Sequence, residues 1–125
     1  MKNNIIDIVS NGFNAKNKWG LVIGDIMLDE YISGDAKRLS PEAPVPIINV
    51  KDNVSKIGGA GNVALNLLGL GIKTILVGEI GDDNSGKILK NLFKENGIPT
   101  KHLIKKKGST TTKTRIISGQ QQMVR

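Results

Sequence analysis

Short apolar runs alternate along the chain with amphipathic segments, and this alternation predicts strands separated by helices. Residues 20–24 and 73–78 are apolar runs next to glycine, which is typical of buried strands in a parallel sheet. Between them, residues 64–70 place apolar side chains at helical spacing, with Val63 and Leu70 on the apolar side. Strand, helix and strand in this order predict a βαβ unit with a right-handed crossover.

A second amphipathic segment begins after residues 81–86, which are rich in glycine and polar side chains. Asp83 or Asn84 can cap the free N–H groups of the helix that follows. We expect Asn96-Gly97 to end this helix. Four large side chains at helical spacing form its expected core stripe: Ile88, Leu89, Leu92 and Phe93.

The remaining segments carry the marks of β-structure. Residues 110–118 are rich in β-branched side chains, and 118–120 have turn chemistry, which predicts a hairpin with residues 121–125 as its returning strand. Three of the four prolines lie between positions 41 and 46. Because proline fixes its own φ and favours extended geometry before it, the pattern predicts a stiff, extended connection into a strand at 47–50.

Composition excludes several classes of protein. The chain has 125 residues and no cysteine, which excludes disulfides and thiolate metal sites and fits a cytoplasmic protein. Its apolar runs are far shorter than a membrane span, so we expect no membrane association. His102 is the one histidine, and a transition-metal site needs more ligands than one histidine provides.

The charge of the chain is unevenly distributed. The net charge is +7, and from residue 87 onward ten Lys and Arg residues face a single acid, Glu95. Such a skew keeps a basic nucleic-acid-binding module open as an alternative of another class. Aromatic residues for base stacking are nearly absent from this part, however, so we expect no nucleic-acid partner.

Two groups of residues are candidates for ligand binding. Gly58 and Gly59 precede the first expected helix, where a backbone without Cβ atoms can approach a ligand and free N–H groups point outward. Asn62 can both donate to and accept from a sugar hydroxyl. Asp29 follows the first strand, where its carboxylate could accept from two neighbouring hydroxyls. The alternative for the glycines is a simple turn, and for Asp29 a turn aspartate bonded to its own backbone.

The complete glycine spacing resembles the first signature of the ribokinase-like sugar kinases, the PfkB family. The pattern is Gly-Gly-Ala-x-Asn-x-Ala from Gly58, followed by Gly71 and Gly81. The resemblance implies that Gly58, Gly59 and Asn62 contact a sugar, and that Asp29 accepts hydrogen bonds from its hydroxyls.

The same resemblance implies the fold and the domain organisation. We expect an α/β, ribokinase-like architecture: a parallel-rich central sheet flanked by helices, with a small β lid. The lid would comprise segments 31–50 and 113–125. In the family such strands often form a dimer contact, so the resemblance also implies a homodimer. Residues 1–18 would be an N-terminal lead-in, and 19–125 the N-terminal part of a sugar kinase domain that is incomplete at its C-terminus.

Two further stretches resemble one branch of the family, the bacterial heptose 7-phosphate kinases. These are Gly-Asp-x-Met-Leu-Asp-x-Tyr at 24–31 and Arg-x-Ser-Pro-Glu-Ala-Pro-Val-Pro at 38–46. The resemblance implies transfer of the γ-phosphate of Mg-ATP to C1 of D-glycero-D-manno-heptose 7-phosphate, in ADP-heptose and lipopolysaccharide biosynthesis. Arg38, Lys113 and Arg115 are candidate partners for the phosphate of the acceptor. Another PfkB-type sugar or nucleoside kinase is the alternative.

The catalytic segment of the family, Gly-Ala-Gly-Asp, does not occur in this sequence. Gly59-Ala60-Gly61 is followed by Asn62, which could not act as a base. We therefore expect the catalytic Asp beyond Arg125, the ATP and Mg²⁺ sites mostly outside this chain, no metal ligand within it, and no activity for the chain alone. Whether a nucleotidyltransferase domain follows is left open.

Overall fold

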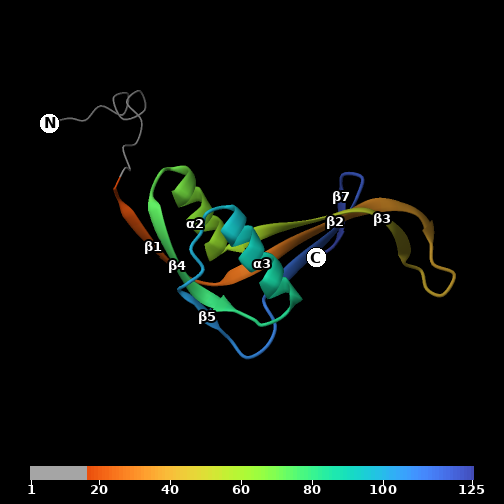
Figure 1. Cartoon of the computed structure of the whole chain (residues 1–125). Helices are drawn as coiled ribbons and strands as arrows, with labels where there is room; N and C mark the ends of the chain where they lie inside the picture. The colour runs from red at the N-terminus through yellow and green to blue at the C-terminus, as the bar shows by residue number, and fades with distance from the viewer. Residues whose placement is uncertain (1–16) are drawn as a thin grey trace, which may run out of the picture.

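The computed structural model describes residues 17–125, so the expected lead-in lies outside the described residues except at its last two positions. Within these described residues, two helices and seven strands follow one another (Figure 1). In order they are β1 (Trp19–Ile23), β2 (Ile26–Leu39), β3 (Pro46–Gly59), α2 (Ala60–Gly69), β4 (Lys73–Ile80), α3 (Asn84–Glu95), β5 (Leu103–Lys105), β6 (Thr112–Ser118) and β7 (Gln121–Val124). None of the helices in this part of the chain is long and apolar enough to cross a membrane.

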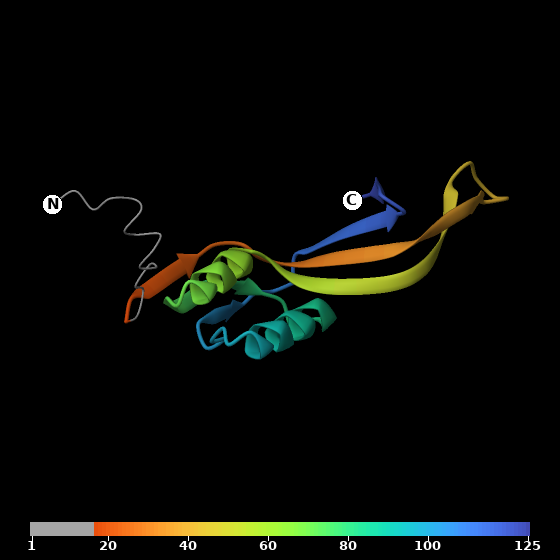
Figure 2. The same cartoon turned by 90° about the horizontal axis from the view of Figure 1, so that it is seen from above.

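The strands form two separate sheets. One has the order β1-β4-β5 with every pair parallel, and the other has the order β3-β2-β6-β7. The expected βαβ unit is confirmed, because β1 and β4 pair in parallel and α2 precedes β4. The β2–β3 hairpin is inserted into this crossover and reaches away from the helices (Figure 2). It belongs to the second sheet, which we call the lid.

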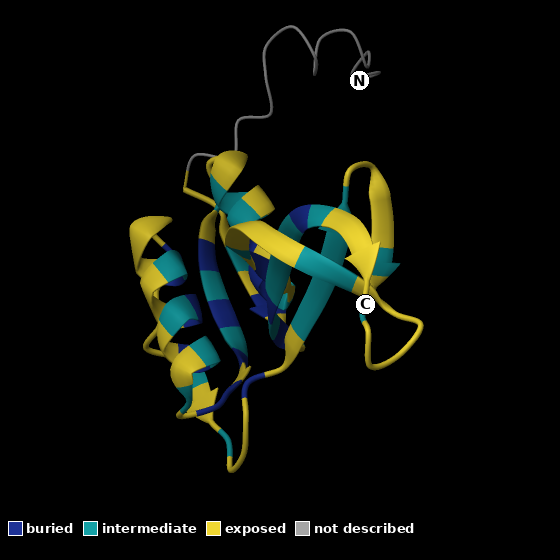
Figure 3. Cartoon of the chain, turned by 90° about the vertical axis from the view of Figure 1, so that its right-hand side faces the viewer, coloured by how far each residue is buried: buried dark blue, intermediate teal, exposed yellow. Residues whose placement is uncertain are grey.

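The core lies between the three-stranded sheet and the two helices. Val22 of β1 pairs with Leu76 of β4, and both belong to one cluster with Ala64 of α2 and Phe93 of α3. The expected stripe of α3 is confirmed, since Leu89 and Phe93 are fully buried while its other two members pack against the cluster. Burial is concentrated here, whereas much of the lid is exposed (Figure 3).

The first strand is correctly placed, but the expectation that it is buried is wrong. Leu21 and Ile23 are 62% and 71% exposed. Side chains alternate across a strand, so these two lie on the side opposite Val22. Both helices cover the Val22 side, and β1 is an edge strand.

The packed side of α2 agrees with the expected one only in part: Ala64, Leu67 and Leu68 pack in or against the core, but the two ends of the expected stripe do not. Val63 and Leu70 are exposed, and the buried residues of α2 are Gly61 and Ala64. A Cβ on Gly61 would lie 2.6 Å from Ile57 and 2.9 Å from the Phe93 ring. Small residues therefore face the core because helix and core approach so closely, which a hydrophobicity pattern does not reveal.

The lid is longer than expected, and its proline-rich segment turns instead of extending. β2 starts before the expected range 31–50 and β3 ends after it, and the six residues between the two strands reverse the chain. The Ser40 N–H donates to the Val45 carbonyl over 2.8 Å, which closes this turn. The hairpin of β6 and β7 is confirmed, with Gly119 in the turn at a φ of 60°.

Candidate functional site

The structure brings together three residues proposed from the sequence. Asp29 Oδ1 lies 3.0 Å from Lys113 Nζ and 3.4 Å from Arg115 Nη1. Asp29 is directly opposite Lys113 in the parallel register of β2 and β6, and Arg115 is two positions further on the same face. All three side chains are more than two-thirds buried, so their charges are screened less than those of surface pairs.

Two neighbours on the same face were not predicted as site residues. Lys56 of β3 is opposite Asp29, and its Nζ lies 5.1 Å from the centroid of the Tyr31 ring. The Arg115 guanidinium carbon lies 4.8 Å from the same ring. Both distances fit cation–π contacts. Strand alternation in the sequence could have placed Tyr31 on the same face as Asp29. It could not have identified Lys56, because the pairing register of the bulged β2–β3 hairpin brings that residue opposite Asp29.

The five residues form a surface that we call the lid cluster: Asp29, Tyr31, Lys56, Lys113 and Arg115. One carboxylate faces three cations, which leaves an excess of two positive charges. The carboxylate can accept hydrogen bonds from hydroxyl groups, while Arg and Lys can bind an anion such as a phosphate ester. The lid cluster therefore combines the two chemistries that a phosphorylated sugar requires.

Gly58 lies beside the lid cluster and makes room for it. Its position in β3 is opposite Met27, and an added Cβ would come within 2.7 Å of Asp29 Oδ2 and 2.8 Å of Met27 Cγ. The ion pairs of Asp29 with Lys113 and Arg115 both use Oδ1, so Oδ2 is the oxygen on the glycine side. The absence of a side chain at Gly58 thus allows the Asp29 carboxylate to approach the backbone of β3 closely.

Gly59 joins the lid to α2. It is the residue before the first turn of the helix, with a φ of 58° that side chains rarely adopt, and an added Cβ would lie 2.3 Å from the Asp25 carbonyl oxygen. The position of the glycine pair at a helix N-terminus is confirmed. No side chain caps this helix and no acid lies in its first turn, so the terminus remains suited to electron-rich ligand atoms.

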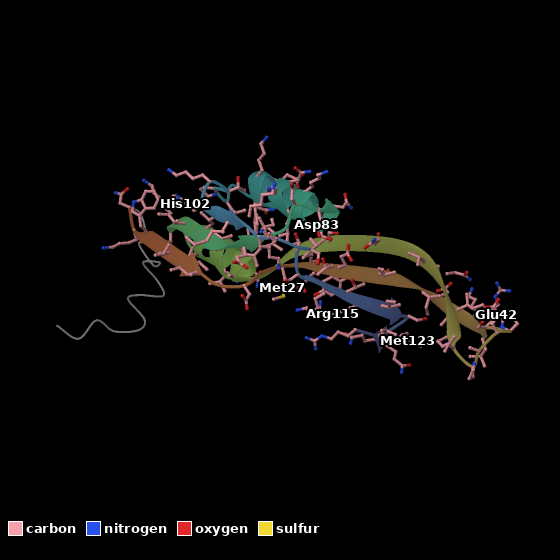
Figure 4. The ribbon with its side chains drawn as sticks, turned by 90° about the horizontal axis from the view of Figure 1, so that it is seen from below. Met27, Glu42, Asp83, His102, Arg115 and Met123 are labelled. Atoms are coloured by element: carbon pink, nitrogen blue, oxygen red, sulfur yellow. The ribbon has the colours of Figure 1, made fainter. Side chains whose placement is uncertain are left out.

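The remaining candidates lie apart from the lid cluster. Asn62 is exposed in the first turn of α2. Arg38 is exposed near the far end of β2, where it borders a hollow with Leu39 and Pro46. It lies nine positions along the strand from Asp29, about 30 Å of extended chain. In Figure 4, Glu42 marks this far end of the lid, well removed from Arg115. The structure therefore does not bring Arg38 to the lid cluster within one chain.

Within residues 17–125, no group of three or more Asp, Glu or His side chains is arranged to hold a metal ion. His102 and Glu42 lie toward opposite ends of the molecule, with Met27 and Arg115 between them (Figure 4).

Comparison with known proteins identifies the family of the chain. The sequence profile of the pfkB family carbohydrate kinases matches residues 20–125. A relative named bifunctional protein HldE from Methylobacillus flagellatus is 45% identical over the whole chain, which covers 26% of that protein. The protein of the same name from Helicobacter pylori is 51% identical over 84% of the chain and 23% of its own length. The chain thus spans about a quarter of the length of these relatives.

Solved structures with the same fold are also carbohydrate kinases. A carbohydrate kinase from Agrobacterium tumefaciens aligns with a TM-score of 0.66 at 21% identity, over 86% of this chain and 34% of its own. Phosphofructokinase-2 from Escherichia coli, in complex with fructose-6-phosphate, aligns with a TM-score of 0.62 at 20% identity, over 86% and 35% of the two chains. These likenesses confirm a ribokinase-like α/β fold, of which this chain contains a part.

Proposed function

The chain belongs to the pfkB family of carbohydrate kinases, and we propose that the complete protein phosphorylates D-glycero-D-manno-heptose 7-phosphate at its C1 hydroxyl. Membership in this family favours a sugar kinase over a nucleic-acid-binding module. The observation that carries the acceptor assignment is the lid cluster, in which Lys113 and Arg115 both lie against Asp29. The name HldE, shared by the relatives, supports a role in heptose metabolism.

In this proposal Asp29 orients the sugar by accepting hydrogen bonds from neighbouring hydroxyls, and Lys113 and Arg115 bind the phosphate that the acceptor already carries. The backbone at Gly58 and Gly59, together with Asn62, contacts the sugar from the α2 side. Before the acceptor binds, Asp29 neutralises part of the cationic charge. The acceptor phosphate adds negative charge where two positive charges are in excess, so binding of a phosphorylated sugar is favoured over binding of a neutral one.

ATP supplies the transferred phosphoryl group in this proposal, and Mg²⁺ would neutralise its developing charge. The described residues contain no acidic cluster suited to Mg²⁺. We therefore assign the nucleotide site, the metal and the catalytic base to the part of the relatives that this chain does not span. The role of the described residues is to position the acceptor, which is a large share of catalysis in phosphoryl transfer. The proposal places the protein in the cytoplasm, in keeping with its lack of cysteine.

The proposal includes a homodimer formed through the lid. β3 and β7 are the edges of the lid sheet and carry unpaired backbone groups. Several large apolar side chains of the lid are exposed and would be covered in such a dimer: Leu39, Val45, Val50, Val54 and Val124. Sedimentation of the complete protein tests this part, since a monomer at micromolar concentration would contradict it.

A panel of acceptors tests the proposed reaction. The complete protein is incubated with ATP and with heptose 7-phosphate, unphosphorylated heptose, ribose, fructose or fructose 6-phosphate, and ADP release is measured. We expect heptose 7-phosphate to have the highest kcat/KM. Faster turnover of fructose 6-phosphate would support the other sugar kinases of this family, and faster turnover of a neutral sugar would remove the phosphate assignment of the lid cluster.

A further inference from the structure

A second carboxylate, Asp83, connects helix α3 to the lid. Its Oδ1 accepts a hydrogen bond from the Gly86 N–H at 2.9 Å, which caps the helix. The same carboxylate also reaches a residue twenty-seven positions further along the chain: the Thr110 N–H donates to Oδ2 at 2.9 Å, and the Thr110 hydroxyl donates to Oδ1 at 2.6 Å. Capping alone would require only the first of these contacts.

Thr110 is held on its other side as well. Its hydroxyl oxygen accepts a hydrogen bond from the Gly81 N–H at 3.0 Å, and the residue is only 4% exposed. The hydroxyl of Thr110, followed by the backbone N–H groups of Thr110 and Gly86, lowers the pKa of Asp83 below its ordinary value. The carboxylate therefore remains charged at neutral pH, as its acceptor role requires.

The two glycines that flank Asp83 in the sequence, Gly81 and Gly86, fit closely around Thr110. A Cβ on Gly81 would lie 2.6 Å from the Thr110 backbone nitrogen, and one on Gly86 would lie 2.9 Å from the Thr110 hydroxyl oxygen. The sequence 81–86 therefore does more than begin α3. Its glycines and Asp83 together enclose the hydroxyl of one threonine.

Thr110 lies where the chain passes from the core to the lid. The next residue, Thr111, accepts a hydrogen bond from the Leu28 N–H at 2.9 Å, and β6 begins at Thr112. Lys113 follows at once, opposite Asp29. The first residue of β6 is thus only two positions from Thr110, which is hydrogen-bonded to Gly81 and Asp83.

We propose that Asp83 and Thr110 are positioning residues for acceptor binding, which hold the base of β6 so that Lys113 and Arg115 lie against Asp29. The identity of the acceptor rests on the function proposed above. The role in positioning the lid strand rests on the contacts of Asp83 and Thr110 alone.

Kinetics of the complete protein test the proposal with matched variants. Thr110→Val removes the hydroxyl and keeps the branched shape, whereas Thr110→Ser keeps the hydroxyl. Asp83→Asn retains an oxygen for the Gly86 N–H but presents an NH₂ group to the Thr110 N–H. Asp82→Asn is the control, because Asp82 is exposed and pairs with Lys105 away from Thr110.

We expect Thr110→Val and Asp83→Asn to raise KM for the acceptor about three- to ten-fold, the effect of one buried hydrogen bond, with KM for ATP unchanged. Thr110→Ser should restore the wild-type value, and Asp82→Asn should leave both constants unchanged. Equal changes in both KM values, or a lower melting temperature with an unchanged acceptor KM, would overturn the proposal and leave a purely structural role.

All variants are assayed with the sugar that the wild-type protein turns over fastest. An error in the heptose assignment therefore changes which sugar is used, but it does not affect the comparison of the variants with the wild type. Hydrogen–deuterium exchange gives a readout that needs no acceptor. We expect faster exchange in residues 112–118 of Asp83→Asn and Thr110→Val, with unchanged exchange in β4. Unchanged exchange in 112–118 would also overturn the proposal.

Discussion

Arg115 Nη1 lies 3.4 Å from Asp29 Oδ1, across 86 positions of sequence. The contact exists because β6 returns to the lid and pairs in parallel with β2 after the chain has formed α2, β4, α3 and β5. A carboxylate near the start of the chain and two cations near its end therefore share one surface.

Replacing Asp29 removes the acceptor of sugar hydroxyls from the lid cluster. We expect Asp29→Asn in the complete protein to fold normally and to lose about 1.5–3 kcal/mol of acceptor binding for each charged hydrogen bond removed. Steady-state kinetics and a melting curve measure the two effects. Asp35→Asn is the control, because Asp35 is a lid carboxylate paired with Lys51. Unchanged kinetics in folded Asp29→Asn would remove Asp29 from the site.

Adding a methyl group at Gly58 should displace the Asp29 carboxylate. The new Cβ would come within 2.7 Å of Asp29 Oδ2, a separation at which one group must move. We expect Gly58→Ala to raise KM for the acceptor about ten-fold, because reorienting a charged acceptor costs about one charged hydrogen bond. Gly69→Ala in α2 is the matched control, since a Cβ there meets nothing within 4 Å. An acceptor KM that changes equally in both variants would contradict the role of Gly58.

The hydrogen bonds of Asp83 predict a pH dependence of stability. Its pKa in the folded protein lies below the ordinary 3.8, chiefly because of the Thr110 hydroxyl. The stabilisation is therefore fully present above pH 3.8 and is lost as the pH falls through the lower, folded pKa. We expect the melting temperatures of the wild type and Asp83→Asn to differ at pH 6 and to converge below pH 3.8. A difference that stays constant down to acid pH would contradict this.

The 125-residue chain alone should show no kinase activity. It carries the lid cluster, whereas we propose that the catalytic base lies outside it, and Leu21 and Ile23 leave one side of the parallel sheet uncovered in the described residues. We also expect it to bind an apolar dye more strongly than the complete protein does. ATP-dependent phosphorylation of a sugar by the purified 125-residue chain would show that the catalytic group lies within it.

Local features of the fold were predictable from the sequence, because their causes are local. Leu89 and Phe93 face the core and Gly119 turns the β6–β7 hairpin, as the pattern predicted, and of the two predicted candidates Asp83 is the one that caps α3. The exposure of Leu21 was not predictable, since periodicity shows which side chains are apolar and not whether another element covers them.

The candidate site was predictable in part. The motif resemblance singled out Asp29, and alternation placed Lys113 and Arg115 on one face, but no local pattern fixes which strands pair. The lid hairpin has register shifts next to Ser33 and Ala36, and only the folded register shows Lys56 opposite Asp29. For Arg38 the resemblance suggested a site shared with Lys113 and Arg115. The length of β2 instead places Arg38 far from Asp29 within one chain.

The preference for a phosphorylated acceptor tests the central claim most directly. The measurement is the ratio of kcat/KM for heptose 7-phosphate to that for unphosphorylated heptose, in the complete wild-type protein, in Arg115→Gln and in the control Lys51→Gln. Charged hydrogen bonds to the phosphate predict a wild-type ratio of at least about a hundred, which falls at least about ten-fold in Arg115→Gln and is unchanged in Lys51→Gln. A wild-type ratio near one, or one that Arg115→Gln leaves unchanged, would contradict the assignment of the lid cluster to the acceptor phosphate.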